Sequence, residues 1–256
     1  MRRQLIAAAA AAILVLGGTA TARAAGGGGE IKAHDWSFSG VFGTFDRGAL
    51  QRGYQVYKEV CSSCHSMNLL YYRNLTEIGF DADSVKDIAA EYEVADGPDG
   101  EGEMFMRPAK PSDRFVAPFA NEQAARASNN GALPPDLSLI VEARFDGPDY
   151  IYSVLTGYED EAPEGVELGE GMNYNHAFPG NQIAMAPPLF EDAVEYGDGT
   201  AATVEQMAED VTTFLTWAAE PMLETRKRMG VKVILFLIVF SALLYAVKRK
   251  VWSDLH

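Results

Sequence analysis

The pair of cysteines at positions 61 and 64 constrains this chain more than any other feature. They are the only two cysteines in 256 residues, and a histidine follows them directly, giving Cys61-Ser62-Ser63-Cys64-His65. A disulfide could form only as a strained loop between the two. A structural zinc ion needs four ligands, and the chain has no further cysteine to supply them. A thioredoxin-like redox pair would lie in a βαβ pattern, which is absent here.

The motif contains each part that covalent haem attachment needs. Two thiolates two residues apart on a tight turn can bond the two vinyl groups of one porphyrin. The histidine that follows then lies below the iron and can ligate it from one face. We therefore predict one covalent haem c, with Cys61 and Cys64 as attachment points and His65 as an axial ligand.

The second axial ligand is a harder choice. Met185 lies in the apolar segment 183–189, where two prolines lower the cost of ordering the loop and apolar neighbours keep water from the sulfur. A His/Met pair would give the haem a higher reduction potential than a His/His pair and would leave no open position on the iron. Core packing of Met185 is the alternative. Met67 follows His65 too closely to reach the opposite face. The remaining candidates are His34, His176, His256, Met104, Met106, Met172, Met207 and Met222.

The first 24 residues have the pattern of a secretory signal peptide. Arg2 and Arg3 precede an apolar stretch at 5–16, and Ala22-Arg23-Ala24 fits a small-x-small cleavage site. The apolar stretch is short for a membrane span, which disfavours an uncleaved anchor. The pattern predicts cleavage after residue 24 and export by a bacterium, which suits covalent haem attachment outside the cytoplasm.

A second apolar segment lies near the C-terminus. Residues 229–247 would form about 28 Å of helix, enough to cross the hydrocarbon core. Lysines and arginines lie on both sides, so charge alone does not set the orientation. The signal peptide sets the orientation instead, because it sends the part after residue 24 across the membrane. We predict a periplasmic domain at 25–225, a transmembrane anchor with basic flanks at 226–250 in the bacterial inner membrane, and a cytoplasmic tail at 251–256.

The exported part is strongly acidic. The whole chain carries −15, but residues 1–24 contribute +3 and the tail from residue 226 contributes +6, which leaves −24 for the part between them. Such a surface repels nucleic acid and attracts basic proteins. The candidate docking clusters, which could equally be solvated faces, are Glu91, Glu93, Asp96, Asp99, Glu101 and Glu103, and the run Glu159-Asp160-Glu161.

The pattern of apolar residues predicts a mostly α fold with long loops. Asp46 is a candidate N-cap for a helix that runs into the cysteine motif, and Thr203 with Gln206 forms a capping box for a helix that Pro221 ends or kinks. Shorter helices are expected at about 137–144 and 150–155, separated by a break at Gly147 and Pro148. Loops are expected at 96–103, 158–171 and 179–188, and little strand pattern is present.

Several stretches, taken in order, resemble one family over nearly the whole mature chain. They are residues 52–65, 72–75, 104–108, 129–138, 185–189, 198–200 and 217–221. The family that they resemble is cytochrome c1, the haem subunit of the ubiquinol–cytochrome c reductase (bc1) complex. The resemblance implies a class I cytochrome c-like haem domain with a single C-terminal transmembrane helix. One departure is the lack of cysteines for a disulfide that some bacterial relatives carry before the distal methionine.

The resemblance also implies roles for individual residues. Met185 would be the distal ligand, and the backbone carbonyl of Pro135 would orient the imidazole of His65. Arg144 and Tyr150 would contact a haem propionate, with Asn129 nearby; a helix-end surface charge is the alternative for Arg144.

The implied role is an electron relay without catalytic residues of its own. The chain would take single electrons from a Rieske iron–sulfur protein and pass them to a soluble basic cytochrome c. Its anchor would pack beside a cytochrome b subunit in a dimeric complex. A haem peroxidase or a gas sensor would instead need an open position on the iron, and His176 is the candidate acid or base for the former.

Overall fold

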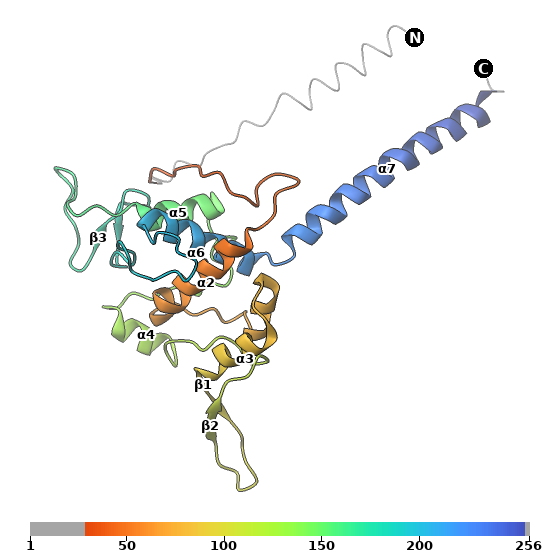
Figure 1. The fold of residues 1–256 in the computed structure, drawn as a ribbon. Coiled ribbons are helices and arrows are strands. Elements are labelled where there is room, and N and C mark those ends of the chain that lie inside the picture. The colour runs from red at the N-terminus through yellow and green to blue at the C-terminus, as the bar shows by residue number, and fades with distance from the viewer. Residues whose placement is uncertain (1–28, 254–256) are drawn as a thin grey trace.

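The computed structural model describes residues 29–253, so the predicted signal peptide and the last three residues lie outside the described part (Figure 1). The described chain is mostly helical, as the sequence predicts. A helical domain with long loops is followed by one long C-terminal helix, which leaves the domain on one side.

Two helices that are far apart in the sequence form the core. Helix α2 (Arg47–Glu59) begins at Asp46, whose carboxylate accepts hydrogen bonds from the amides of Gly48 and Ala49. Helix α6 (Val204–Ala219) begins at Thr203, whose hydroxyl accepts a hydrogen bond from the Gln206 amide. Both predicted starts are therefore confirmed. These caps satisfy amides that the helix itself leaves unpaired.

The two helices pack closely because α2 carries a glycine where they cross. A Cβ added at Gly53 would lie 2.0 Å from the carbonyl oxygen of Asp210. Beside it, Tyr54 packs edge-on against Phe214 at 5.8 Å between ring centroids. Arg52 binds the fully buried Asp210 carboxylate through Nε and Nη2, each at 2.9 Å. The crossing therefore fixes α2, and with it the cysteine motif at its end.

Smaller elements surround this pair. Strands β1 (Glu93–Asp96) and β2 (Phe105–Pro108) form an antiparallel hairpin, and β3 (Asn173–Tyr174) pairs with β4 (Gln182–Ile183). The sequence patterns missed both pairs and predicted their connections as loops. Before residue 147, the remaining helical segments are a 3₁₀ turn at Cys61–Ser63, a 3₁₀ helix at Tyr72–Ile78, α3 (Ala82–Ala90) and α4 (Glu122–Ser128).

The prediction for the middle of the chain was wrong in two places. Residues 137–144 form successive turns and not a helix, and their first residues hydrogen bond to the segment after the cysteine motif. Helix α5 (Gly147–Thr156) includes Gly147 and Pro148, which were predicted as a break, and so begins three residues before the expected start at Tyr150. Asp146 and Gly147 have positive φ angles of 62° and 49°, which turn the chain, and Pro148 is tolerated in the first helical turn.

The C-terminal helix α7 (Leu223–Val251) has 29 residues. Within the described part of the chain it is the one helix that is long and apolar enough to cross a membrane, and none of its apolar core is buried against the domain. Glu220, Pro221 and Met222 separate it from α6. Pro221 therefore ends the preceding helix, as predicted.

Candidate haem-binding site

The cysteine motif lies on a tightened turn at the end of α2. The helix ends at Glu59, and the amides of Cys64 and His65 both bond to the carbonyl oxygen of Cys61, at 3.1 and 2.9 Å. The hydroxyl of Ser62 bonds to the carbonyl of Lys58 at 2.7 Å. This turn brings the two thiols and the imidazole onto consecutive positions of one short segment. Both cysteines are free and half-buried, and burial raises the pKa of the Cys61 thiol to about 12.

The imidazole of His65 is oriented by a residue 70 positions away. Its Nδ1 lies 2.8 Å from the carbonyl oxygen of Pro135. Because a carbonyl only accepts, Nδ1 carries the proton and Nε2 keeps its lone pair. Burial lowers the pKa of His65 despite the opposing effects of Pro135 and Asp136, which favours the neutral ring. A neutral imidazole with a free Nε2 is the form that ligates iron.

Asp136 fastens the segment before it to the segment after His65. One carboxylate oxygen accepts hydrogen bonds from the Ser66 hydroxyl at 2.8 Å and the Asn68 amide at 2.7 Å. The other accepts from the Ser138 amide at 2.9 Å. Burial opposes the negative charge, but these hydrogen bonds outweigh it and lower the pKa of Asp136. Asp136 is not among the predicted site residues; its local signal is an aspartate two residues before a serine, a common turn-forming pattern.

A second group of contacts holds the backbone at Met185. Its carbonyl oxygen accepts hydrogen bonds from the hydroxyl of Tyr158 at 3.0 Å and the side-chain amide of Asn173 at 3.3 Å. The Met185 side chain is half-buried and packs against a small apolar cluster of Val154, Ala177 and Ile183. The β3–β4 pair lies immediately before it in the chain. Hydrogen bonds thus brace this loop, in a chain that has no cysteines for a disulfide there.

Of the three residues predicted near a haem propionate, Arg144 and Tyr150 are neighbours in the structure, and Asn129 makes a contact of its own. Tyr150 packs against the same apolar cluster as Met185, and burial raises the pKa of its hydroxyl, opposed by the nearby Arg144. Arg144 is exposed, and its guanidinium also donates to the carbonyl of Ala143 at 3.0 Å. Asn129 donates its side-chain amide to the Ala125 carbonyl at 2.7 Å, at the end of α4. The structure thus brings Arg144 to Tyr150, whereas the amide of Asn129 is engaged with its own helix.

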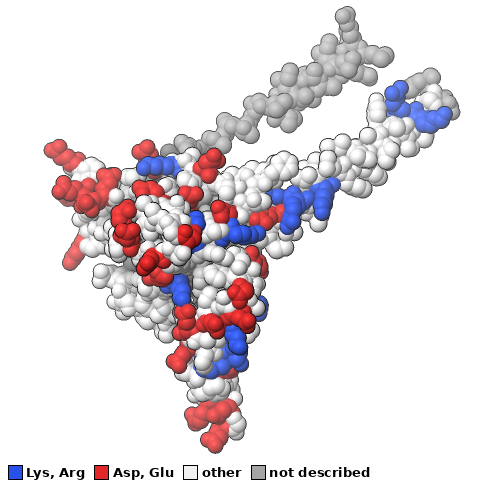
Figure 2. Space-filling view, viewed as in Figure 1, with Lys and Arg blue, Asp and Glu red and all other residues white. Residues whose placement is uncertain are grey.

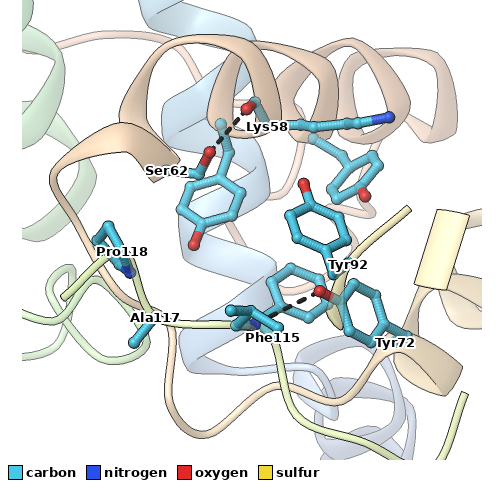
Figure 3. Close-up of a pocket in the computed structure, with 10 residues that line it drawn as sticks. Lys58, Ser62, Tyr72, Tyr92, Phe115, Ala117 and Pro118 are labelled. Atoms are coloured by element: carbon cyan, nitrogen blue, oxygen red, sulfur yellow. Dashed lines mark hydrogen bonds between the residues drawn. The ribbon is translucent and has the colours of Figure 1, made fainter. Parts of the chain in front are cut away.

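A cavity of about 230 Å³ adjoins the motif at Ser62 (Figure 3). Ser62, inside the motif, is one of its lining residues, but none of the predicted haem-binding residues lines it. Lys58 at its edge forms an ion pair with Glu91 at 2.6 Å. The other lining residues are Tyr54, Tyr57, Tyr72, Tyr92, Phe115, Val116, Ala117 and Pro118.

The donor set fits an iron porphyrin. Two free thiols with the C-x-x-C-H spacing lie beside an imidazole whose Nδ1 is already bonded and whose pKa burial lowers, and a thioether lies in a braced apolar loop. Within the described residues, no cluster of three or more His, Cys, Asp or Glu side chains offers an alternative metal site.

The helical fold and this donor set together define a class I cytochrome c-like domain, carried on a single C-terminal transmembrane helix. The family model described as Cytochrome C1 family matches residues 36–255. The chain belongs to the cytochrome c1 family.

Individual relatives agree with this assignment. The chain is 50% identical over 235 residues to "Cytochrome c1" of Rhodospirillum rubrum, covering 86% of each chain. It is 55% identical over 222 residues to "Cytochrome c1, heme protein, mitochondrial" of Schizosaccharomyces pombe, covering 87% of this chain and 72% of that one. It is also 52% identical over 242 residues to "Cytochrome b/c1" of Bradyrhizobium diazoefficiens, covering 86% of this chain but only 35% of that longer protein.

Proposed function

We propose that the chain carries one covalent haem c, bonded to Cys61 and Cys64, with His65 and Met185 as its axial ligands. The observation that carries the proposal is the 2.8 Å contact between His65 Nδ1 and the Pro135 carbonyl, which leaves Nε2 free for iron. The name of the Schizosaccharomyces relative, a haem protein, supports the cofactor. Arg144 and Tyr150 would hold a propionate, for which a hydrogen-bonded cation is the physical requirement.

In this proposal the chain is an electron relay. The haem supplies reversible one-electron chemistry. The protein holds both ligands still: Pro135 fixes the imidazole ring, while Tyr158 and Asn173 fix the backbone of Met185. Ligands that do not move between oxidation states would keep the reorganisation energy of electron transfer small. They would also keep the sixth position on the iron closed. The chain alone would therefore transfer electrons without transforming a substrate.

The proposed setting is the bc1 complex. The name of a Candida albicans relative at 51% identity, "Cytochrome b-c1 complex catalytic subunit, mitochondrial", supports membership. We propose that a Rieske iron–sulfur protein delivers electrons, that a soluble basic cytochrome c removes them, and that α7 packs beside cytochrome b in a dimeric complex. Acidic side chains gather at the tip of the β1–β2 hairpin and in the loop after α5 (Figure 2), which suits a basic partner.

The proposed location follows from the anchor. The domain would lie in the periplasm, α7 would cross the inner membrane, and residues 251–256 would lie in the cytoplasm. Lysines and arginines are visible at both ends of α7 (Figure 2). Residues 1–24 would be removed as the signal peptide.

The test uses the full chain isolated from gently solubilised membranes. After denaturation, haem that stays with the polypeptide in the pyridine haemochrome assay is expected, together with a low-spin spectrum of the native protein and no rapid carbon monoxide binding to the reduced form. Copurification of a b-type cytochrome and an iron–sulfur protein would place the chain in the complex. Extractable haem, or a site open to carbon monoxide, would contradict the proposal.

A further inference from the structure

A compact turn before α2 carries two outward-facing apolar side chains. Between residues 36 and 44 the chain closes on itself through bonds from the Ser39 amide to the Trp36 carbonyl and from the Thr44 amide to the Ser37 carbonyl, at 2.9 and 3.1 Å. Phe38 points inward and is 5% exposed. Val41 and Phe42 at the tip are 61% and 85% exposed. A rigid turn that holds two large apolar residues in water calls for a contact that covers them.

The turn is attached to the beginning of α7. Lys227 Nζ donates to the carbonyl of Phe38, on one side of the tip, and lies 3.4 Å from the carbonyl oxygen of Gly43 on the other. Next to the turn, the Phe45 amide donates to the Glu224 carboxylate at 2.9 Å. In Figure 1 the orange segment before α2 lies on the side of the domain from which α7 departs. The turn therefore keeps a fixed position relative to the first two turns of α7.

When α7 spans a bilayer, the part of the helix that holds the turn lies at the level of the lipid headgroups. The apolar part of α7 begins at Met229, two residues or about 3 Å along the helix from Lys227. The headgroup layer extends about 5–8 Å from the hydrocarbon on each face of a bilayer. Lys227 would thus lie within the headgroups when α7 spans the membrane, and a turn clamped to it can bring its tip to the same depth.

The charges nearby favour lipid over another protein surface. Arg226, Arg228 and Lys232 are exposed in the same part of α7. The acidic neighbours are already paired: Glu224 binds Arg47, and Glu220 binds Arg226. Exposed cations on the first turns of α7, together with two exposed apolar residues on the turn bonded to Lys227, match the phosphates and acyl-chain boundary of a phospholipid surface.

We propose that the 39–43 turn is a second membrane contact, in which Val41 and Phe42 enter the headgroup layer of the bilayer that α7 crosses. Arg228 and Lys232 face the phospholipid phosphates beside it. This inference rests on the proposed membrane anchoring. Its consequence is that the domain touches the membrane at two points and therefore has a defined orientation above it.

The test compares tryptophan substitutions in the full haem-loaded chain, reconstituted in phosphatidylcholine nanodiscs with normal or brominated acyl chains. Phe42→Trp is the probe, and Phe105→Trp on the β1–β2 hairpin, away from α7, is the matched control. Fluorescence of the unsubstituted protein is subtracted. Phe42→Trp should show a blue-shifted emission and a loss of intensity with lipid brominated near the headgroup, and Phe105→Trp should show neither. Val41→Trp gives an independent probe if the Phe42 variant fails to retain haem.

Equal behaviour of the probe and control variants would overturn the inference. A failure of the anchor itself is recognised separately, because the native Trp252 at the end of α7 is 52% exposed and should also be quenched when α7 spans the bilayer. If Trp252 is quenched and Phe42→Trp is not, only the turn is wrong. Quenching that disappears once the complete complex is reconstituted would also overturn the inference, since another subunit would then cover the turn.

Discussion

His65 Nδ1 and the carbonyl oxygen of Pro135 lie 2.8 Å apart, although 70 residues separate them in the chain. Asp136, the next residue, bonds to Ser66 and Asn68, so the two segments are joined on both sides of this contact. The orientation of the imidazole is therefore a property of the tertiary fold, set by a small group of hydrogen bonds.

Replacing Asp136 with alanine should loosen that group. The Ser66 hydroxyl and the Ser138 amide, whose bonds are partly buried, would lose their acceptor, at a cost of about 1–3 kcal/mol in the free energy of unfolding for each group left unsatisfied. The exposed Asn68 amide would bond to water instead. Denaturant unfolding of the haem-loaded protein measures this. Asp136→Asn keeps one oxygen acceptor and should retain part of the stability. Unchanged stability in Asp136→Ala would show that the carboxylate does not hold the two segments together.

Replacing Met185 with leucine should open the sixth position on the iron. The thioether would be lost while the apolar volume is retained, so reduced protein should bind carbon monoxide. The midpoint potential should fall by more than about 59 mV, equivalent to a tenfold shift toward the oxidised form. Met172→Leu, in the preceding loop, is the matched control and should change neither property. A closed site with normal potential in Met185→Leu would exclude Met185 as the ligand.

Replacing Gly53 with alanine should separate the core helices. The added Cβ would lie 2.0 Å from the Asp210 carbonyl oxygen, so α2 and α6 must move apart, at a cost of about 1–3 kcal/mol in the free energy of unfolding. Gly48→Ala, in the same helix, meets only the ends of the Asp46 and Arg52 side chains and should be near neutral. Thermal or denaturant unfolding of both variants tests the prediction, which fails if they are equally stable.

The β1–β2 hairpin should loosen in acid. Arg107 binds Asp96 and lies 2.6 Å from Asp113, and these hydrogen bonds lower the pKa of both carboxyls below the ordinary value of about 4. The ion pairs are therefore fully formed above pH 4 and are lost as the pH falls below it. The protection factors of the amides at 93–108, which are exchange rates corrected for the pH dependence of intrinsic exchange, should fall over that range. In Arg107→Gln the protection factors should be lower at neutral pH and should change little with acid; a retained acid response would point to other groups.

Local signals predicted the elements whose causes are local. Asp46 and Thr203 cap their own helices, and the apolar residues that repeat every three or four positions along α6 are buried: Met207, Val211, Phe214, Leu215 and Ala218. The elements that were predicted wrongly or missed involve contacts between residues far apart in the chain. Residues 137–144 have a helical pattern, but their start is tied to a distant segment, because the Leu137 amide bonds to the Ser66 carbonyl and the Ser138 hydroxyl accepts from the Leu69 amide. In the hairpin, Arg107 on β2 binds Asp96 on β1 and Asp113 beyond β2.

The candidate site likewise contains residues that local sequence identifies and residues that only the fold brings together. The C-x-x-C-H motif is contiguous, so its residues could be found from spacing alone. Met185 could be favoured from its apolar, proline-containing loop. Pro135, Arg144 and Tyr150 could be named only through resemblance to a family, because no pattern in the sequence shows which distant loops meet. Asp136 lies in a local turn pattern that does not reveal its bonds to Ser66 and Asn68. Tyr158 and Asn173 carry neither kind of signal, since their role is to hold the backbone of Met185.

The short passage from α6 to α7 restricts how the domain can move. Glu220, Pro221 and Met222 are the whole connection, the Leu223 side chain is buried in the domain, and Glu224 is bonded to Phe45 and Arg47. No linker longer than this stands between the domain and the helix. When α7 spans a bilayer as proposed, the domain would therefore keep one height and tilt relative to it, and a proposed redox partner would have to approach the domain.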